Sequence, residues 1–147
     1  MSKHFIKRFT STLDQLQELR VFINEICKNI KERGNEKIYI ELQLAINEIF
    51  CNVVKHSYLN EIGGDIVIEG RLARRGIHIT FFDQGIPFNP YKLNISNITE
   101  TSQSGFGLLI VKSITDGLSY TSKKDEKDWN RLRIFKHYMP EEKNYEY

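Results

Sequence analysis

The chain is predicted to fold as a two-layer α+β sandwich, in which helices cover one face of a mixed, mostly antiparallel sheet. Apolar and polar residues alternate in five short runs, which is the period of half-buried strands. In three longer runs the apolar residues recur every three or four positions, as in helices with one buried face. Two pairs of strands are joined by short turns, which favours hairpins and a sheet covered on one side.

Composition favours a single domain that spans residues 1–147. Hydrophobic content of 40% and charged content of 27% are ordinary for a globular chain. The net charge of +2 is too small to indicate nucleic-acid binding or an anionic membrane surface. No apolar run approaches the roughly 20 residues of a membrane span, and the first residues lack the apolar core of a signal peptide. We therefore expect a cytoplasmic protein whose two cysteines are reduced.

The first strand is expected at Lys3 to Thr10, where apolar residues alternate with basic ones. Ser11 or Thr12 can cap the helix that follows, and Thr12 with Gln15 has the spacing of a capping box. One face of this helix carries an apolar stripe, and Gly34 is expected to end it. The stripe comprises Leu13, Leu16, Arg20, Ile23, Cys27 and Ile30, widened by Leu19, Phe22 and Ile26.

The second helix is expected to start after Asn35, which can cap it, and to end near Tyr58. Asn60 and the pair Gly63-Gly64 are breakers that favour an end at this point. Its core stripe is Ile38, Leu42, Ala45, Ile49 and Val53. This helix carries the polar residues that most need an explanation.

A hairpin is predicted from the alternating run 65–73, the turn 74–76 and the strand 77–82. Residues 83–107 follow with no sustained periodicity, and a connection of that length inside a compact domain is typical of a functional lid. A third helix is expected at about 106–116, ended by Gly117. The final hairpin is expected from strands 118–122 and 130–138.

Three polar residues, Glu48, Asn52 and His56, are four positions apart on the second helix, so they share one face. Glu48 could serve as a general base. The carboxamide oxygen of Asn52 suits a hard cation such as Mg²⁺. The alternative is a solvated stripe, and the helix alone does not decide between them. For His56 a structural role at the helix end is favoured, since no second His or Cys stands at metal-ligand spacing.

Two glycine-containing motifs follow further along the chain. Asp83 and Gly85 stand at the end of a predicted strand, where the carboxylate could cap a turn or accept a hydrogen bond from an adenine amino group. The segment Gly105-Phe106-Gly107-Leu108 precedes or opens the third helix. Its backbone amides could hold a phosphate at the helix N-terminus, or the glycines could form an ordinary flexible loop end.

Taken together, these motifs resemble the ATP-binding domains shared by gyrase, the chaperone Hsp90, sensor histidine kinases and MutL. The motif Glu48-x-x-x-Asn52 resembles the N box of that superfamily. The other two motifs resemble its first and second glycine boxes. The extended segments around all three, together with Asn130-Arg-Leu132, are similar to the branch of anti-sigma factors and serine-protein kinases.

The resemblance implies a histidine-kinase-like ATPase fold that binds ATP and Mg²⁺. Glu48 would be the catalytic base toward a serine or threonine hydroxyl, and Asn52 would bind Mg²⁺. Asp83 would recognise adenine, and Gly85 would make room beside it. The lid would span residues 87–104. Phosphates would be held by the backbone of Gly105, Phe106, Gly107 and Leu108.

The implied function is an anti-sigma-factor-type serine/threonine protein kinase that phosphorylates an antagonist protein in a partner-switching pathway. Partners would be that antagonist and a sigma factor or other regulator, and a homodimer is expected through the first strand and helix. The chain lacks the Thr often found near the start of the last strand, and Lys92 is the only basic residue of the lid. These departures leave two alternatives: a non-catalytic, nucleotide-gated binding module, and a stand-alone histidine-kinase-type ATPase domain.

Overall fold

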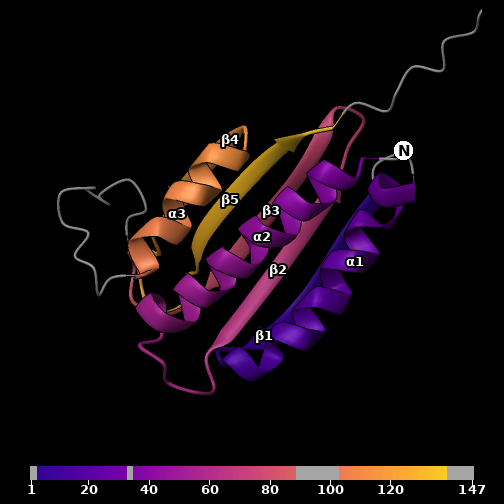
Figure 1. The fold of residues 1–147 in the computed structure, drawn as a ribbon. Coiled ribbons are helices and arrows are strands. Elements are labelled where there is room, and N and C mark those ends of the chain that lie inside the picture. Colours follow the sequence, from indigo (N-terminus) through magenta and orange to yellow (C-terminus); the bar gives the residue numbers. More distant parts are fainter. Residues whose placement is uncertain (1–2, 33–34, 89–102, 139–147) are drawn as a thin grey trace, which may run out of the picture.

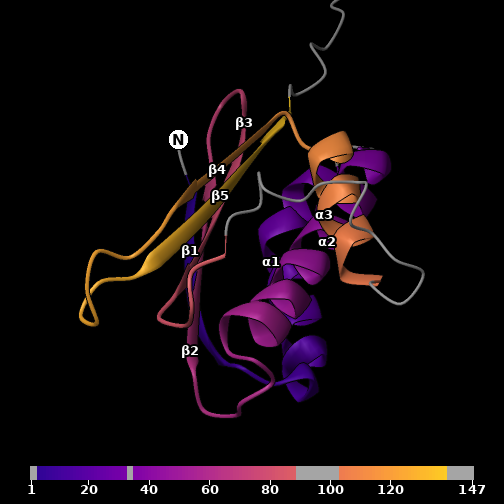
Figure 2. The ribbon, with the colours of Figure 1, turned by 90° about the vertical axis from the view of Figure 1, so that its left-hand side faces the viewer.

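A computed structural model describes residues 3–32, 35–88 and 103–138. In that part of the chain three helices cover one face of a five-stranded sheet, so the predicted two-layer α+β class is confirmed (Figures 1 and 2). The elements are β1 (Lys3–Thr10), a 3₁₀ turn (Leu13–Gln15), α1 (Leu16–Glu32), α2 (Glu36–Asn52), a π-helical turn (Val53–Ser57), β2 (Asp65–Leu72), β3 (Gly76–Asp83), α3 (Gln103–Ile114), β4 (Gly117–Thr121) and β5 (Asn130–His137).

The strand order is β1-β2-β3-β5-β4, and all four neighbouring pairs are antiparallel. The sheet was expected to be mixed and mostly antiparallel, and every pairing among the described strands is antiparallel. Both predicted hairpins are present. The second hairpin inserts β5 between β3 and β4, which sets Asp83 at the end of β3 opposite Asn130 at the start of β5.

The core lies between the sheet and the helices, as the apolar patterns predicted. Strand β2 buries every second residue from Ile66 to Gly70, and β3 buries six of its eight residues. Helices α1 and α2 each bury one stripe. Two members of the expected stripe are wrong. Leu13 is 41% exposed, because it belongs to the 3₁₀ turn that precedes α1, and Arg20 is exposed on α1 itself. The largest fully buried side chains include Phe9, Phe50 and Phe81.

The helix ends partly follow the predicted caps. Thr12 accepts a hydrogen bond from the Asp14 amide at 3.4 Å, and the Gln15 side chain accepts one from the Thr10 amide at 3.3 Å. The glutamine therefore reaches past the residue that a capping box would use. Asn35 stands at the start of α2, but its side chain makes no capping hydrogen bond, so that expected role is wrong. The expected stop at Gly34 lies outside the described residues.

The end of α2 contains a change of helical pitch. After Asn52 the chain forms one π-helical turn, in which the Tyr58 amide bonds to the Val53 carbonyl at 3.1 Å. Leu59 and Asn60 then take positive φ angles of 52° and 62°, which ends the helix at the place that the breakers predicted. Single π-turns inside helices are frequent at functional sites.

Both cysteines are free thiols, as expected. Cys27 is buried in the core and Cys51 is half-buried. Burial raises the pKa of Cys27 to about 12. The helices in the described ranges also include no segment both long and apolar enough to cross a bilayer.

Candidate functional site

The helical side of the candidate site is formed by α2 and the π-turn after it. Glu48 is half-buried, and Asn52, one turn later, is 3% exposed. His56 does not continue this row, because the wider π-turn intervenes and leaves it exposed. Burial, followed by the charge of Lys55, lowers the pKa of His56.

Gly107 of α3 lies directly against Glu48 and Asn52. A Cβ atom built on this glycine would overlap the Glu48 Oε2 atom and would lie 3.7 Å from the Asn52 Nδ2 atom. Two segments far apart in the sequence therefore meet here, and the absence of a side chain at position 107 is what allows the contact. With alanine at position 107, the methyl group would keep the Glu48 carboxylate further from the backbone of α3.

Asn52 carries an unusual polar atom. Its Nδ2 is buried and has no hydrogen-bond partner in the described part of the chain. Buried polar groups are almost always paired, so the carboxamide of Asn52 is available to bind a ligand or an ion. Because the oxygen and nitrogen of a carboxamide are assigned from hydrogen bonds rather than observed, either atom could occupy this position.

The strand side of the site is centred on Asp83, the last residue of β3. Its carboxylate is 2% exposed and accepts hydrogen bonds from Asn130 Nδ2 at 2.9 Å and from the Gly85 amide at 3.0 Å. Burial raises the pKa of Asp83, while the bonds from Asn130 and Gly85 and the charge of Lys123 oppose the shift. The ionised carboxylate is thus held in place at a desolvation cost.

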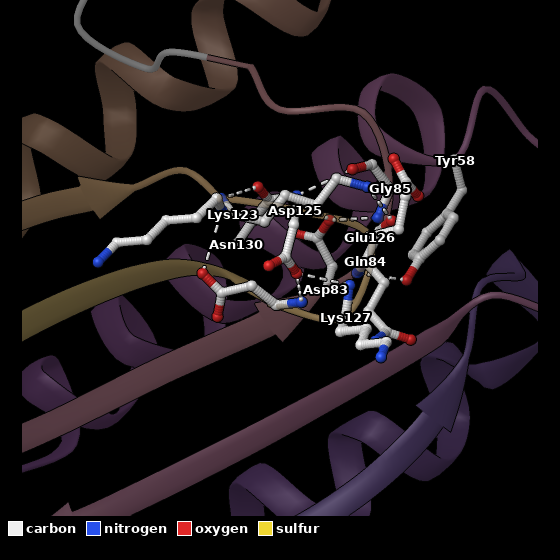
Figure 3. A network of polar contacts seen from close by, with 11 residues as sticks. Tyr58, Asp83, Gln84, Gly85, Lys123, Asp125, Glu126, Lys127 and Asn130 are labelled. Atoms are coloured by element: carbon white, nitrogen blue, oxygen red, sulfur yellow. Dashed lines mark hydrogen bonds and ion pairs between the residues drawn. The ribbon is translucent and has the colours of Figure 1, made fainter.

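Asn130 links the end of β3 to the residue after β4 by hydrogen bonds. Its Nδ2 also donates to the Gly85 carbonyl at 3.0 Å, and its Oδ1 accepts from the Lys123 amide at 2.8 Å. The Lys123 ammonium donates to the Gln84 carbonyl at 2.9 Å. Figure 3 shows Asn130, Lys123, Gln84 and Gly85 gathered around Asp83.

Tyr58 connects this network to the end of the π-turn. Its hydroxyl accepts from the Gln84 amide at 2.8 Å and donates to the Asp65 carbonyl at 2.6 Å. Ser57 provides a second link, because its carbonyl accepts from the Ile86 amide at 2.7 Å. A Cβ atom at Gly85 would overlap that carbonyl. Gly85 is therefore required for the close packing of the strand end on the helix end.

Phe88 is the last described residue before the segment expected to be the lid. Its amide donates to the Tyr120 hydroxyl at 3.2 Å, and the two ring centroids are 5.9 Å apart. The His56 ring lies on the other side, 6.0 Å from the Phe88 ring. Most of the expected lid, 87–104, lies outside the described residues, as does Lys92.

The third helix starts earlier than the sequence predicted. It begins at Gln103 rather than near Phe106, so Gly105 and Gly107 lie inside its first two turns. The amides of the cap residue and of the first three residues of an α-helix have no intrahelical partner, so within the described part of α3 the free amides belong to residues 103–105. The side chain of Leu108 is buried, and its expected role in phosphate binding through the backbone stays a prediction.

The structure thus brings the predicted residues into two groups. Glu48, Asn52 and Gly107 meet between α2 and α3, and Asp83 and Gly85 meet beside the end of the π-turn. Three residues of the network carry no motif and were missed: Tyr58, Lys123 and Tyr120. Asn130 was singled out only as a residue of the resembled branch, and its bonds to Asp83 and Gly85 give it a definite structural role.

The donor set is compatible with Mg²⁺ but with few protein ligands. The described residues contain no group of three or more His, Cys, Asp or Glu side chains suited to a metal. Mg²⁺ keeps several waters and is often held by one or two side chains plus substrate phosphates. The buried, incompletely paired carboxamide of Asn52 beside Gly107 fits that pattern.

Comparison with known proteins identifies the same architecture. The family model of the histidine kinase-like ATPase domain matches residues 9–136, which is most of the chain. A serine-protein kinase, RsbW of Bacillus mycoides (strain KBAB4), is 25% identical over 87 residues. The match covers 53% of this chain and 53% of the relative, so the chain spans about half the length of the curated relative that it matches.

Proposed function

Because the chain belongs to the histidine kinase-like ATPase domain family, we propose that it is an ATP-dependent serine/threonine protein kinase of the anti-sigma type. The similarity to a serine-protein kinase supports the class of reaction. The proposed substrate is the serine or threonine hydroxyl of an antagonist protein in a partner-switching pathway. A sigma factor or another regulator is the proposed second partner.

The observation that carries this proposal is the contact of Gly107 with both Glu48 and Asn52. A phosphate placed at the start of α3 would lie near one carboxylate and one carboxamide, which are the groups that a phosphoryl transfer requires. Glu48 is half-buried, so it can reach both a bound nucleotide and an incoming protein hydroxyl. We assign Glu48 as the base that orients this hydroxyl and accepts its proton as the oxygen attacks the γ-phosphorus.

Asn52 is the proposed Mg²⁺ ligand. When bound, Mg²⁺ would supply positive charge that offsets part of the negative charge of the phosphates. The chain itself contributes the carboxamide and the positive end of α3, where the amides of residues 103–105 have no intrahelical partner. We assign phosphate binding to the backbone of Gly105, Phe106, Gly107 and Leu108, which lie in the first two turns of α3.

Adenine recognition is assigned to Asp83 and Gly85. The Asp83 carboxylate is fixed by Asn130 and by the Gly85 amide, so its position does not depend on the nucleotide. A preorganised carboxylate can accept a hydrogen bond from the adenine amino group with little further ordering. Residues 87–104 are the proposed ATP lid.

The proposed assembly is a homodimer in the cytoplasm. β1 forms one edge of the sheet and exposes Ile6, and α1 exposes Val21. An edge strand with unpaired backbone groups is a ready surface for a second copy. This part of the proposal is tested by sedimentation at several protein concentrations.

The kinase proposal is tested by transfer of the γ-phosphate of ATP to a candidate antagonist protein in the presence of Mg²⁺. We expect Glu48→Gln to lower the rate at least a hundredfold, the contribution typical of a general base, while ATP still binds. Asn47→Asp, on the neighbouring position of α2, is the control for a changed charge on the helix. Equal rates for wild type and Glu48→Gln would refute the assigned base.

A non-catalytic, nucleotide-gated binding module is the second candidate. It is favoured by two absences in the sequence: residues 128–131, near the start of the last strand, contain no threonine, and the expected lid, 87–104, contains no arginine. The same assay separates the two functions. Binding of ATP and ADP without transfer, with a partner affinity that differs between the two nucleotides, would support the second candidate.

A further inference from the structure

The sheet has a second face that no helix covers. Figure 2 shows all three helices on one side of the sheet and nothing described on the other. On this open face two cavities lie side by side and share Glu69. We call the two together the sheet patch; its lining residues are Ile6, Val67, Glu69, Arg71, His78, Thr80, Phe82, Trp129, Arg131 and Arg133.

The first cavity, of about 270 Å³, is rich in cationic side chains. Arg71, His78 and Arg133 line it together with Thr80 and Glu69. The carboxylate of Glu69 is already engaged by Arg71 at 2.8 Å and lies 3.6 Å from His4. Arg133 bonds to the Thr80 hydroxyl at 3.2 Å and forms no ion pair within the described ranges. One guanidinium in this cavity is therefore left without a counter-charge.

The pKa of His78 is affected by the same excess of positive charge. Burial lowers the pKa of His78, and the charges of Arg133 and Arg71 lower it further. Its Nδ1 atom is buried and has no hydrogen-bond partner in the described structure. An anionic group in this cavity would supply both a counter-charge and a hydrogen-bond acceptor.

The second cavity, of about 290 Å³, is mainly apolar. Val67 and Phe82 face each other across β2 and β3, and Trp129 closes one side. Ile6 adds a side chain that is 60% exposed. Such a hollow fits an aliphatic or aromatic side chain.

We propose that the sheet patch binds a segment of a partner protein in which an acidic side chain stands next to a large apolar one. The acidic group would occupy the cavity of Arg133, and the apolar group would occupy the cavity of Trp129. This surface lies on the face of the sheet opposite the helices that carry Glu48 and Asn52. The proposal does not depend on the proposed kinase activity.

Charge argues against the two other occupants. A polynucleotide would bring a phosphate next to Glu69, which stands between the cavities, and the net charge of +2 gives the chain little general affinity for it. A second copy related by a twofold axis would bring the same surface against itself. Three arginines would then face three arginines with one glutamate on each side.

Trp129 is the only tryptophan of the chain, so its fluorescence reports directly on the patch. The probe is an acetylated hexapeptide of alternating glutamate and leucine. We expect a saturable blue shift of the emission, no shift with the matching lysine–leucine peptide, and at least tenfold weaker binding to Arg133→Glu. The matched control Arg74→Glu, in the exposed turn between β2 and β3, should bind as wild type.

Three results would overturn the proposal. The first is that the glutamate–leucine peptide causes no emission shift even at millimolar concentration. The second is that a ten-nucleotide thymidine strand binds more tightly than the peptide. The third is that the wild type self-associates in sedimentation and Arg133→Glu abolishes this association. Nucleotide binding by Arg133→Glu should match that of wild type, which shows that the variant is folded. If Arg133→Glu lost nucleotide binding, the sheet patch and the nucleotide site would not be independent surfaces. The peptide titration would then be repeated with Arg133→Gln, which removes the charge without reversing it.

Discussion

Gly107 of α3 lies so close to Glu48 of α2 that a methyl group at position 107 would overlap the Glu48 carboxylate. The contact joins two helices whose motifs are separated by the whole of the first hairpin. It also places the acidic side chain of Glu48 beside the second turn of α3, near the helix N-terminus, where the helix dipole favours negative charge. The close approach of Glu48 to α3 therefore depends on the absence of a side chain at position 107.

Gly107→Ala should separate stability from activity. Alanine is favoured over glycine inside a helix by about 1 kcal/mol, and the atom that it would strike is the flexible end of Glu48. We expect the free energy of unfolding to stay the same or rise, while phosphate transfer falls at least tenfold because Glu48 is displaced. Urea unfolding and the transfer assay provide the two measurements.

The control for this variant is Ser113→Ala, an exposed position on the same helix. It should leave the transfer rate unchanged. Transfer by Gly107→Ala at the wild-type rate would show that the contact with Glu48 has no part in the reaction.

Asp83→Asn should improve the stability of the nucleotide-free protein in a pH-dependent way. The pKa of Asp83 is raised by burial, so at neutral pH the folded state pays to keep the carboxylate ionised. This cost is absent at pH values below the pKa of Asp83 in the unfolded chain. It grows as the pH rises from there to the higher pKa of Asp83 in the folded state. The advantage of the variant in free energy of unfolding should thus be largest near pH 7 and should shrink as the pH falls toward 4.

The same change should weaken ATP binding by at least tenfold, or about 1.4 kcal/mol, because an amide replaces the acceptor proposed for the adenine amino group. Calorimetric titration with ATP measures the affinity, and chemical denaturation at several pH values measures the stability. Asp65→Asn, at the start of β2, is a suitable control. An unchanged affinity for Asp83→Asn would remove Asp83 from adenine recognition.

Tyr58→Phe should loosen the junction between the π-turn and β3. The hydroxyl holds the Gln84 amide and the Asp65 carbonyl, and its loss leaves both backbone groups without this partner. We expect a loss of about 1–3 kcal/mol in the free energy of unfolding. ATP affinity should fall as well, because Gln84 is adjacent to Asp83.

Tyr39→Phe, on α2 and away from the site, serves as the control for removing a tyrosine hydroxyl. Its Oη bonds to the side chain of Asn24 rather than to the backbone of the site. If Tyr58→Phe lost stability but kept full ATP affinity, the hydroxyl would be a structural element only.

The sequence was sufficient to predict the element order and most of the core, because both depend on local periodicity. The strand ends were predicted within one or two residues for β1 and β2. The start of α3 was predicted three residues late, since Gln103, Ser104 and Gly105 show no apolar period and glycine disfavours helix interiors. The π-turn after Asn52 was not predicted, because its apolar spacing is compatible with an ordinary helix.

The candidate site divides in the same way. Residues that belong to a spaced motif, such as Glu48 and Asn52, could be found from the sequence. The roles of Tyr58 and Lys123 could not, because each binds backbone atoms of a distant loop and leaves no spacing pattern. The pairing of Asp83 with Asn130 follows from the insertion of β5 beside β3, and hairpin patterns do not specify which strands become neighbours.

Asn130→Asp tests whether the fixed geometry of Asp83 matters to the fold as well as to the nucleotide. The Asn130 side chain is fully buried and donates to both Asp83 and the Gly85 carbonyl. A carboxylate there would lose both donated bonds and would place a second negative charge beside Asp83. We expect a loss of about 3–5 kcal/mol in the free energy of unfolding at pH 8, the range typical of an uncompensated buried charge.

The loss should be smaller at pH 5. Two adjacent carboxyls in the folded state have raised pKa values, so the variant takes up a proton more readily when folded than when unfolded, and it regains stability as the pH falls. Urea unfolding at pH 8 and pH 5 measures the difference, with Asn60→Asp in the exposed turn as the control for the same chemical change. If the loss were equal at the two pH values, repulsion between positions 83 and 130 would not be its cause.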